Sequence, residues 1–198
     1  MVSMYIRAPR RVIASISAAF VAGSIALTGT AAGAPSEPVN FTSFYEIRAR
    51  HSDMCLDVAH QSKAHAADVI QGRCWGGWNQ QWRVVRLDSG HLEIRARHSD
   101  MCLDVAHQSK AHAANVIQGR CWGGENQQWN IRGMSSSDFE MLPDGTNMPK
   151  EGAFVRIIAR HSGGHLDVAH QSKAHAANVV QAQWWGGENQ QWRFIKVG

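Results

Sequence analysis

Residues 94–129 read IRARHSDMCLDVAHQSKAHAANVIQGRCWGGENQQW, and the chain contains this stretch three times. Residues 47–82 repeat it with two changes, and residues 157–192 form a looser third copy in the same register. A repeat of this length is one structural unit that buries its apolar face only by packing on its neighbours. The repeat therefore predicts an architecture of three equivalent lobes.

Each copy opens with an alternation of apolar and polar residues, as in residues 45–50. This period of two is typical of half-buried antiparallel strands. In the first copy, further short strands are expected at residues 55–58, 69–71 and 82–86, with a loop at 60–68. The sequence therefore predicts four short strands in each of the three lobes, twelve in all.

The number of copies limits how the lobes can be arranged. A propeller usually needs four or more blades, and a solenoid would show atypical terminal repeats. A closed barrel hides its strand edges and suits three equal units. We expect an all-β fold with pseudo-threefold symmetry and lobes at about residues 44–90, 91–134 and 153–198. The third copy follows 16 residues later than the repeat step predicts, which indicates an exposed loop within residues 130–154.

The first 34 residues are typical of a secretory signal peptide, with three early arginines, an apolar stretch at residues 12–27 and Ala-Gly-Ala at 32–34. The apolar stretch is too short to favour a membrane span. The segment has no acidic residue, so its removal lowers the formal charge to +1 (+4 − 3). The remaining chain shows no basic patch of the kind that nucleic-acid binding needs. We expect a secreted protein with a short lead-in at residues 35–43 and one domain at 44–198.

The four cysteines lie in the first two copies, 19 positions apart within each copy, and the third copy lacks both. Joint loss is what pairing within a copy predicts, so we expect the disulfides Cys55–Cys74 and Cys102–Cys121 among the three connectivities that four cysteines allow. A zinc site is the alternative, but it needs closer spacing of the ligands.

A Cys-Leu-Asp-Val strand, a second cysteine followed by Gly-Gly, and Asn-Gln-x-Trp together resemble the repeat of ricin B-type (R-type) lectins, which also occurs in family-thirteen carbohydrate-binding modules. The likeness covers residues 44–197, and Gln-x-Trp ends at Trp82, Trp129 and Trp192. The resemblance implies a β-trefoil with up to three shallow sugar sites, one in each lobe. It also implies that these tryptophans are core anchors, as suits their large apolar area.

The resemblance implies an acid, a histidine and two amides at each sugar site. The expected carbohydrate-binding residues are Asp57, His60, Asn79 and Gln80, then Asp104, His107, Asn126 and Gln127, then Asp167, His170, Asn189 and Gln190. A carboxylate offers two acceptor oxygens to adjacent hydroxyls, and an amide can donate to one hydroxyl and accept from another. The alternatives are turn or strand-end capping for Asp and Asn and a structural tie between strands for Gln.

The family commonly sets an aromatic residue two positions before the second cysteine, as a platform under the sugar. At the matching positions this chain has Gly72, Gly119 and Ala182. The available substitutes are Trp75, Trp122 and Trp185. They are expected either to stack on a sugar or to cover the disulfide and the core.

We expect a secreted, non-catalytic lectin whose weak single sites gain affinity from multivalent engagement of a carbohydrate. The alternative is a protein-binding β-trefoil, an inhibitor or toxin component that has lost its affinity for sugar. Each acid and histidine recurs at a lectin position rather than in a separate nucleophile–base pair, so no catalytic residue and no cofactor are expected. A second histidine follows the first by five residues, as at His65, but this spacing is weak support for a metal, and none is expected.

Overall fold

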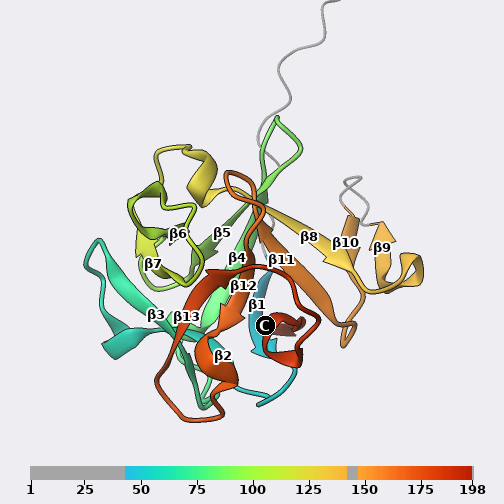
Figure 1. Cartoon of the computed structure of the whole chain (residues 1–198), viewed down its shortest axis with the longest axis horizontal. Helices are drawn as coiled ribbons and strands as arrows, with labels where there is room; N and C mark the ends of the chain where they lie inside the picture. The colour runs from blue at the N-terminus through green and yellow to red at the C-terminus, as the bar shows by residue number, and fades with distance from the viewer. Residues whose placement is uncertain (1–42, 142–146, 198) are drawn as a thin grey trace, which may run out of the picture. The chain divides into compact units, whose positions relative to one another are not determined.

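The computed structural model describes residues 43–141 and 147–197, whose main strands form three lobes of four (Figure 1). The strands are β1 Phe44–Ala49, β2 Cys55–Val58, β3 Ala67–Gly72 and β4 Gln81–Arg86; β5 Leu92–Ala96, β6 Cys102–Val105, β7 Ala114–Gly119 and β8 Trp129–Gly133; and β11 Val155–Ala159, β12 His165–Val168, β13 Ala177–Ala182 and β14 Trp192–Val197. The expected signal peptide and all but the last residue of the expected lead-in lie outside the described residues.

Short 3₁₀ helices occupy equivalent places in the three lobes. Those that follow the second strand are Ala59–Gln61, Ala106–Gln108 and Ala169–Gln171, and those that precede or meet the fourth strand are Trp78–Gln80, Glu125–Gln127 and Glu188–Gln190. The extra segment between the second and third lobes contains the 3₁₀ helix Ser136–Asp138 and a small hairpin, β9 Phe139–Met141 and β10 Asn147–Pro149. The described part of this segment thus adds a hairpin beside the expected loop.

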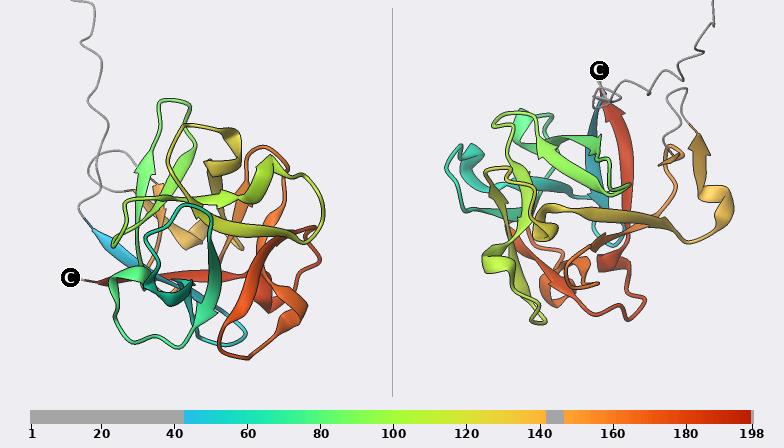
Figure 2. Two further views of the ribbon diagram at one scale, coloured as in Figure 1. Left: turned by 90° about the vertical axis from the view of Figure 1, so that its left-hand side faces the viewer. Right: turned by 90° about the horizontal axis from the view of Figure 1, so that it is seen from above.

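Six of the strands close a barrel. β1 pairs with β4, β4 with β5, β5 with β8, β8 with β11, β11 with β14, and β14 with β1, all antiparallel. The last pairing joins the two ends of the domain, from Phe44 opposite Val197 to Ala49 opposite Trp192, and Figure 2 shows β1 (blue) beside β14 (red). The ring leaves none of these six strands as a free edge.

The other six strands form three hairpins, β2–β3, β6–β7 and β12–β13. The second strands of these hairpins also pair with one another in a cycle, β3 with β7, β7 with β13 and β13 with β3. A six-stranded barrel with a cap of three mutually paired hairpins is a β-trefoil. The expected fold, with three four-strand lobes and pseudo-threefold symmetry, is confirmed.

The tryptophan that ends each Gln-x-Trp is fully buried and belongs to the common core. In the first lobe the indole Nε1 of Trp82 donates a hydrogen bond to the backbone oxygen of Leu56 (2.9 Å). Trp129 and Trp192 make the same bond to Leu103 (3.0 Å) and Leu166 (2.9 Å). Each indole therefore ties the fourth strand of a lobe to its second strand, and the predicted core role is confirmed.

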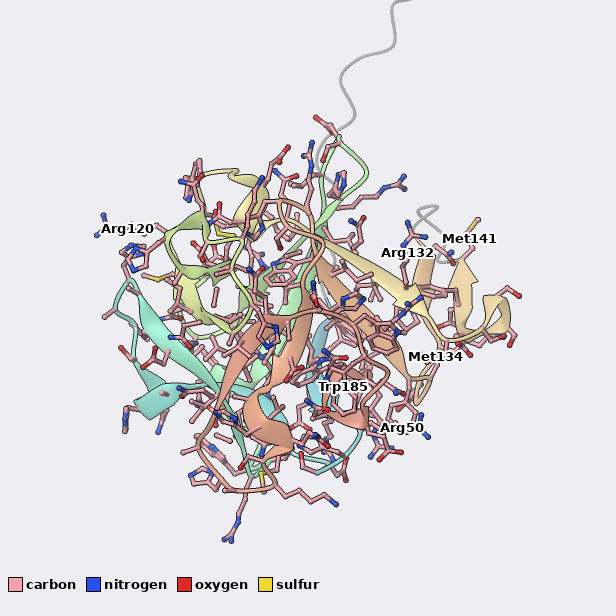
Figure 3. The ribbon with its side chains drawn as sticks, in the orientation of Figure 1. Arg50, Arg120, Arg132, Met134, Met141 and Trp185 are labelled. Carbon is pink, nitrogen blue, oxygen red and sulfur yellow. A yellow bond between two sulfur atoms is a disulfide. The ribbon has the colours of Figure 1, made fainter. Side chains whose placement is uncertain are left out.

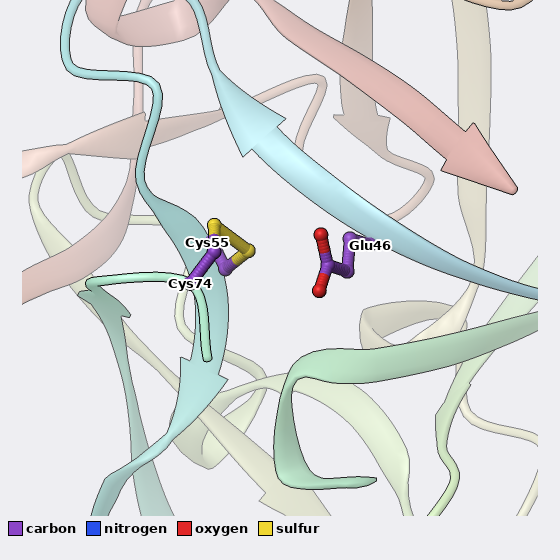
Figure 4. A group of neighbouring side chains, drawn as sticks. All are labelled: Glu46, Cys55 and Cys74. Atoms are coloured by element: carbon purple, nitrogen blue, oxygen red, sulfur yellow. A yellow bond between two sulfur atoms is a disulfide. The ribbon is translucent and has the colours of Figure 1, made fainter. Parts of the chain in front are cut away.

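Both expected disulfides are present, Cys55–Cys74 and Cys102–Cys121. Figure 4 shows the carboxylate of Glu46 facing the first of them, and the group Glu46, Cys55 and Cys74 has the residue types of a metal site. Metal binding by cysteine needs the thiolate, and these sulfurs are joined to each other. The carboxylate instead accepts a hydrogen bond from the Nη2 of Arg48 at 2.6 Å.

In the third lobe an aromatic pair takes the place of the disulfide. The rings of His165 and Trp184 lie with their centroids 5.0 Å apart, and the guanidinium carbon of Arg156 lies 5.0 Å from the centroid of the Trp184 ring. His165 is only 8% exposed. Its burial, together with the nearby charge of Arg156, lowers its pKa to about 4. The lobe is thus held by the packing of a neutral histidine rather than by a covalent bond.

We expect acidification from pH 6.5 to pH 4 to destabilise the protein through His165. The unfolded chain protonates this histidine near its ordinary pKa of 6.5, whereas the folded protein does so only near 4. Between these values the unfolded state binds more protons, so the free energy of unfolding falls as the pH falls, and the effect is absent above pH 6.5. Its size should be about 1–3 kcal/mol. Urea unfolding of the wild type and of His165→Leu across this range measures it, and an identical pH dependence of the two proteins would contradict the assignment.

No helix in the described ranges is long and apolar enough to cross a membrane.

Candidate functional site

A buried carboxylate held by two amide donors recurs in each lobe. In the first lobe Asn79 Nδ2 donates to Asp57 Oδ1, and Gln80 Nε2 donates to Asp57 Oδ2, both at 2.6 Å. In the second and third lobes the corresponding distances are 2.6 and 2.7 Å for Asn126 and Gln127 on Asp104, and 2.8 and 2.8 Å for Asn189 and Gln190 on Asp167. The aspartate comes from the second strand of the lobe and the amides from the 3₁₀ helix near the fourth strand. The structure therefore brings together the expected Asp, Asn and Gln of each copy.

The glutamine of each group lies behind the carboxylate rather than at the surface. Gln80 is fully buried, and besides Asp57 it donates to the backbone oxygen of Arg73 (2.9 Å) and accepts from the backbone nitrogen of Trp75 (2.9 Å). Gln127 and Gln190 are equally buried and make the same contacts. In place of the expected contact with a ligand, the structure gives Gln80, Gln127 and Gln190 a positioning role, because they have no exposed atoms to offer.

Burial raises the pKa of Asp57 above its ordinary value of 3.8, and the hydrogen bonds from Gln80 and Asn79 oppose this rise. The same causes raise the pKa values of Asp104 and Asp167. A donor that bonds the ionised form stabilises it. The two amides therefore favour the ionised carboxylate, which is the form that accepts hydrogen bonds at both oxygens.

In the first two lobes the carboxylate lies where the side chain of an aromatic platform would need space. Gly72 lies opposite Cys55 in the β2–β3 pair, and a Cβ added to it would lie 2.3 Å from Asp57 Oδ2. Gly119 stands in the same relation to Asp104. In these two lobes the carboxylate occupies the space that a side chain would need, so an aromatic residue does not fit there. The third lobe has Ala182 at this position, and Ala182 lines the pocket of that lobe.

The tryptophan after the second cysteine position lies beside each carboxylate at the surface. Trp75, Trp122 and Trp185 are 60%, 59% and 55% exposed, and Figure 3 shows Trp185 near the surface of the third lobe. A Cβ added to Gly77 would lie 2.2 Å from the ring of Trp75, so this ring packs directly on the glycine backbone. The glycine supports one side of the ring and leaves the other side open.

Three surface pockets contain these groups, with volumes of about 440, 630 and 730 Å³ in the first, second and third lobes. The pocket of the first lobe is lined by Asp57, His60, Trp75 and Asn79, among others. The second pocket is lined by Asp104, His107, Trp122 and Asn126, and the third by Asp167, His170, Trp185 and Asn189. Apart from the glutamines, all the expected site residues therefore line a pocket of their own lobe.

The backbone at the pocket histidines is left-handed. His60 has φ 57° and ψ 20°, and Gln61 has φ 53°. The equivalent residues His107, Gln108, His170 and Gln171 repeat these values within a degree. Non-glycine residues are uncommon in this region and collect at functional sites, where the surrounding structure holds them. The histidine thus reaches the pocket from a locally strained turn that all three lobes keep.

Each pocket also receives a histidine from a different lobe, which sequence reasoning did not place there. His175 of the third lobe lines the pocket of Asp57, His65 lines that of Asp104, and His112 lines that of Asp167. His60 and His65 of one copy therefore serve different pockets and do not share a metal site. The only signal in the sequence was that the second histidine recurs in all three copies.

A buried glutamine holds the loop that carries this histidine. Gln71 donates to the backbone oxygens of Ser172 (2.7 Å) and Ala174 (2.8 Å), which precede His175. Gln118 and Gln181 bind the corresponding loops of the first and second lobes. The Nδ1 of His175 then accepts from the backbone nitrogen of Arg73 at 3.3 Å. Because this nitrogen accepts, Nε2 carries the proton and can donate to a ligand.

The three pockets are not identical in charge. Asp68 lines both the first and the second pocket and accepts a hydrogen bond from Asn115 Nδ2 at 2.7 Å. The third pocket is lined by Asn178 at the corresponding position. Among the described residues that line the third pocket, Asp167 is the one carboxylate.

Comparison with protein families matches the chain to the model described as "Ricin-type beta-trefoil lectin domain-like" at residues 37–119, 78–149 and 126–198. A search of curated proteins found no match.

Solved structures share the fold. The designed threefold-symmetric protein ThreeFoil is 40% identical, with a TM-score of 0.68 over 78% of this chain and 99% of its own. An exo-β-1,3-galactanase from Clostridium thermocellum is 30% identical, with a TM-score of 0.67 over 79% of this chain and 31% of its own, so the likeness spans about a third of that enzyme. A ricin B-like lectin from Macrolepiota procera, solved with lactose, is 16% identical, with a TM-score of 0.59 over 76% of this chain and 93% of its own.

Proposed function

Because the chain belongs to the family of ricin-type β-trefoil lectin-like domains, we propose that it is a carbohydrate-binding protein with three sugar sites, one in each lobe. The observation that carries this proposal is the recurrence of an amide-held carboxylate beside an exposed tryptophan in three separate pockets. A sugar ring presents adjacent hydroxyls on its edge and an apolar face, and each pocket offers a partner for both.

The carboxylate has acceptor capacity left for a sugar. An ionised carboxyl group has about four lone-pair positions on its two oxygens. In the first lobe Asn79 uses one position on Asp57 Oδ1, and Gln80 uses one on Oδ2. One acceptor position on each oxygen is therefore left unused, and Asp57 lines the pocket, which suits two neighbouring hydroxyl groups. Such hydrogen bonds to a charged acceptor are about twice as strong as neutral ones.

The amide and the tryptophan complete the proposed site. Asn126 lines the second pocket and Asn189 lines the third, and each donates from Nδ2 to the aspartate of its own pocket. The open side of the Trp122 or Trp185 ring supplies the apolar surface. Stacking from this tryptophan replaces the platform that the family commonly places at the glycine positions.

The proposed role is non-catalytic. Glycoside hydrolysis commonly uses a pair of carboxyl groups on either side of the scissile bond. The group that recurs in all three lobes contains one carboxylate, and Asp68 joins the first two pockets but not the third. Three sites built on the shared group are therefore suited to binding rather than to hydrolysis.

The proposal includes secretion. The first 34 residues have the composition of a signal peptide. The disulfides Cys55–Cys74 and Cys102–Cys121 are of a kind that persists in oxidising compartments outside the cytosol.

A glycan and polysaccharide binding screen of the purified protein tests the proposal. Galactose-containing glycans come first, because the Macrolepiota procera lectin was solved with lactose. The expected result is saturable binding to at least one glycan, competed by the free sugar. Capture of a protein partner that no sugar displaces, with no binding in the screen, would instead support the protein-binding β-trefoil.

The histidine that each pocket receives from another lobe gives a sharper test of how the sites are built. In a protein that carries Asp57→Ala and Asp167→Ala, the pocket of Asp104 is the one left intact. Adding His65→Ala should weaken sugar binding by about 2- to 10-fold, because it removes one hydrogen-bond donor from that pocket. Adding His112→Ala to the same background is the matched control and should change nothing, since His112 lines the pocket of the third lobe. Calorimetric titration measures the sugar affinity of both variants. Equal effects of the two substitutions would contradict a site in which His65 of one lobe joins Asp104 of another.

A further inference from the structure

A further cavity lies outside the three proposed sugar pockets. Its volume is about 640 Å³, and it shares no lining residue with the three pockets described above. Its walls come from the ends of β4 and β5, from β8 and β11, and from the segment that leads into the β9–β10 hairpin. Figure 3 shows Arg132 and Met134 of this wall on the side of the molecule that carries β8 and the hairpin.

The lining is basic. It contains the arginines Arg86, Arg132 and Arg156, together with the hydroxyls of Ser135 and Ser136, and none of its described residues is acidic. Arg86 and Arg132 are exposed, and Arg156 is half-buried. The cavity therefore combines a concentration of positive charge with neutral hydrogen-bond donors.

Two of these arginines face each other across a strand pair. Arg156 on β11 lies directly opposite Arg132 on β8 in the antiparallel register. Like charges directly opposite each other destabilise a strand pair. An anion bound between them would remove this cost.

The barrel has two other junctions between successive lobes, the strand pairs β14–β1 and β4–β5, which correspond to β8–β11. Neither of them pairs two arginines in this way. At the equivalent places, Glu46 lies opposite Ile195 and Glu93 lies opposite Val85. Those junctions therefore pair one acid with an apolar residue, whereas the third pairs two arginines. The three strand pairs come from equivalent places in the repeat, and the β8–β11 pair is the one with two positive charges at this position.

The arginine pair also lacks the ion-pair partner that the repeat normally supplies. Glu46 and Glu93 each accept a hydrogen bond from an arginine two residues later, at 2.6 Å. In the third lobe that later residue is Ile158. Within the described part of the chain, neither Arg132 nor Arg156 has a carboxylate within ion-pair distance, and Arg156 Nε is buried with no hydrogen-bond partner.

We propose that this cavity binds a tetrahedral oxyanion, a sulfate or phosphate group, between Arg132 and Arg156. The planar guanidinium group presents its donors in a fork that matches such oxygens, and hydrogen bonds between charged partners are strong. The hydroxyl of Ser136 offers a further donor on the same wall, whereas that of Ser135 is hydrogen-bonded to Ser137 Oγ at 2.9 Å. The anion is either free or carried as a sulfate ester on an acidic polysaccharide. The site needs none of the sugar-binding residues, so it stands or fails separately from the proposed lectin sites.

Titration of the full-length protein with sodium sulfate, followed by amide chemical shifts in two-dimensional NMR, tests the site directly. Sodium chloride of equal ionic strength is the control for screening. The expected result is a saturable shift of the amides of Arg132, Ser135 and Ser136 with sulfate alone. Shifts that do not saturate, or that chloride reproduces, would overturn the proposal.

A second measurement identifies the source of the anion and keeps the test independent of folding. Dextran sulfate is compared with uncharged dextran on the wild type, on Arg132→Gln and on Lys196→Gln. Arg132 and Lys196 are both exposed, and each substitution removes one positive charge, but Lys196 does not line the cavity. Arg132→Gln should weaken dextran sulfate binding by about tenfold or more, and Lys196→Gln by about twofold at most.

The outcomes separate the alternatives. Weak binding of dextran sulfate together with saturable binding of free sulfate would assign the site to a free anion. Equal losses from Arg132→Gln and Lys196→Gln, without a saturable sulfate shift, would reduce the effect to general surface charge and overturn the proposal. Arg156→Gln provides a further check where its thermal unfolding matches that of the wild type, and it should lose sulfate binding as Arg132→Gln does.

Discussion

Replacing Asp57, Asp104 and Asp167 with alanine in one protein is expected to abolish sugar binding in every lobe. Each carboxylate supplies the two acceptor oxygens of its pocket, so its loss should weaken a single site by about 100-fold, given hydrogen bonds of about 1.5–3 kcal/mol to a charged group. The measurement is calorimetric titration with the strongest glycan from the binding screen. Single substitutions should remove one site each and lower the stoichiometry before they lower the affinity of the sites that remain.

A charge-matched control separates this effect from a change in net charge. Asp53→Asn, Asp88→Asn and Asp100→Asn together remove the same three charges from surface positions outside the pockets. Asparagine tolerates the left-handed backbone of Asp53 and Asp100. This control should bind sugar as the wild type does. Undiminished binding by the triple alanine variant, with its circular dichroism and unfolding unchanged, would show that the carboxylates are not the binding groups.

Loss of both disulfides is expected to have the largest effect on stability. Each bond closes a loop between cysteines that are 19 residues apart, which should contribute about 3 kcal/mol in the chain-entropy model. Together they would account for about 6 kcal/mol, against a typical domain stability of about 5–15 kcal/mol. The protein without them should therefore be close to unfolding at room temperature. Urea unfolding of Cys55→Ala with Cys74→Ala, of Cys102→Ala with Cys121→Ala, and of the combined variant measures each contribution.

Reduction of the wild-type protein is the matched control, because it breaks the same bonds without removing any side-chain volume. Reduction should lower the unfolding midpoint of the wild type to about that of the combined variant. Any remaining difference measures the destabilisation caused by the alanine substitutions themselves. The third lobe, with His165 packed on Trp184, has no bond to reduce. If the midpoint of the wild type did not change under reduction, the disulfides would not be what stabilises the first two lobes.

Local patterns made most of the fold predictable. The alternation of apolar and polar residues at 45–50 is a local property of the sequence, so it could be recognised without knowing the fold. The structure has the corresponding strand β1 at Phe44–Ala49. The strand expected at residues 55–58 is β2, Cys55–Val58. The disulfide pairing was readable because the third copy lost both cysteines at once, so the repeat acted as an internal comparison. The extra hairpin between the second and third lobes was not predicted, since its short strands carry no clear alternation.

The candidate site was only partly predictable. The sequence placed Asp57, Asn79 and Gln80 together but treated both amides as ligand contacts. Burial separates them, since Gln80 is fully enclosed behind the carboxylate while Asn79 lines the pocket. Adjacent residues with similar amide side chains cannot be distinguished by composition, because the direction of each side chain depends on the turn that carries it. The same holds for Gly72, whose lack of a side chain is understood only once the carboxylate above it is seen.

The amino-acid sequence alone determined that three lobes of four strands close on one another, that two of them carry a disulfide and that each presents an acid and an amide. These features follow from patterns within one copy and from comparison of the three copies. Tertiary structure alone decided that His65 completes the pocket of Asp104 and that Arg132 faces Arg156. The reason is that nearly identical copies give a residue the same neighbours in sequence, so only the order in which the lobes meet around the barrel decides which copy it contacts.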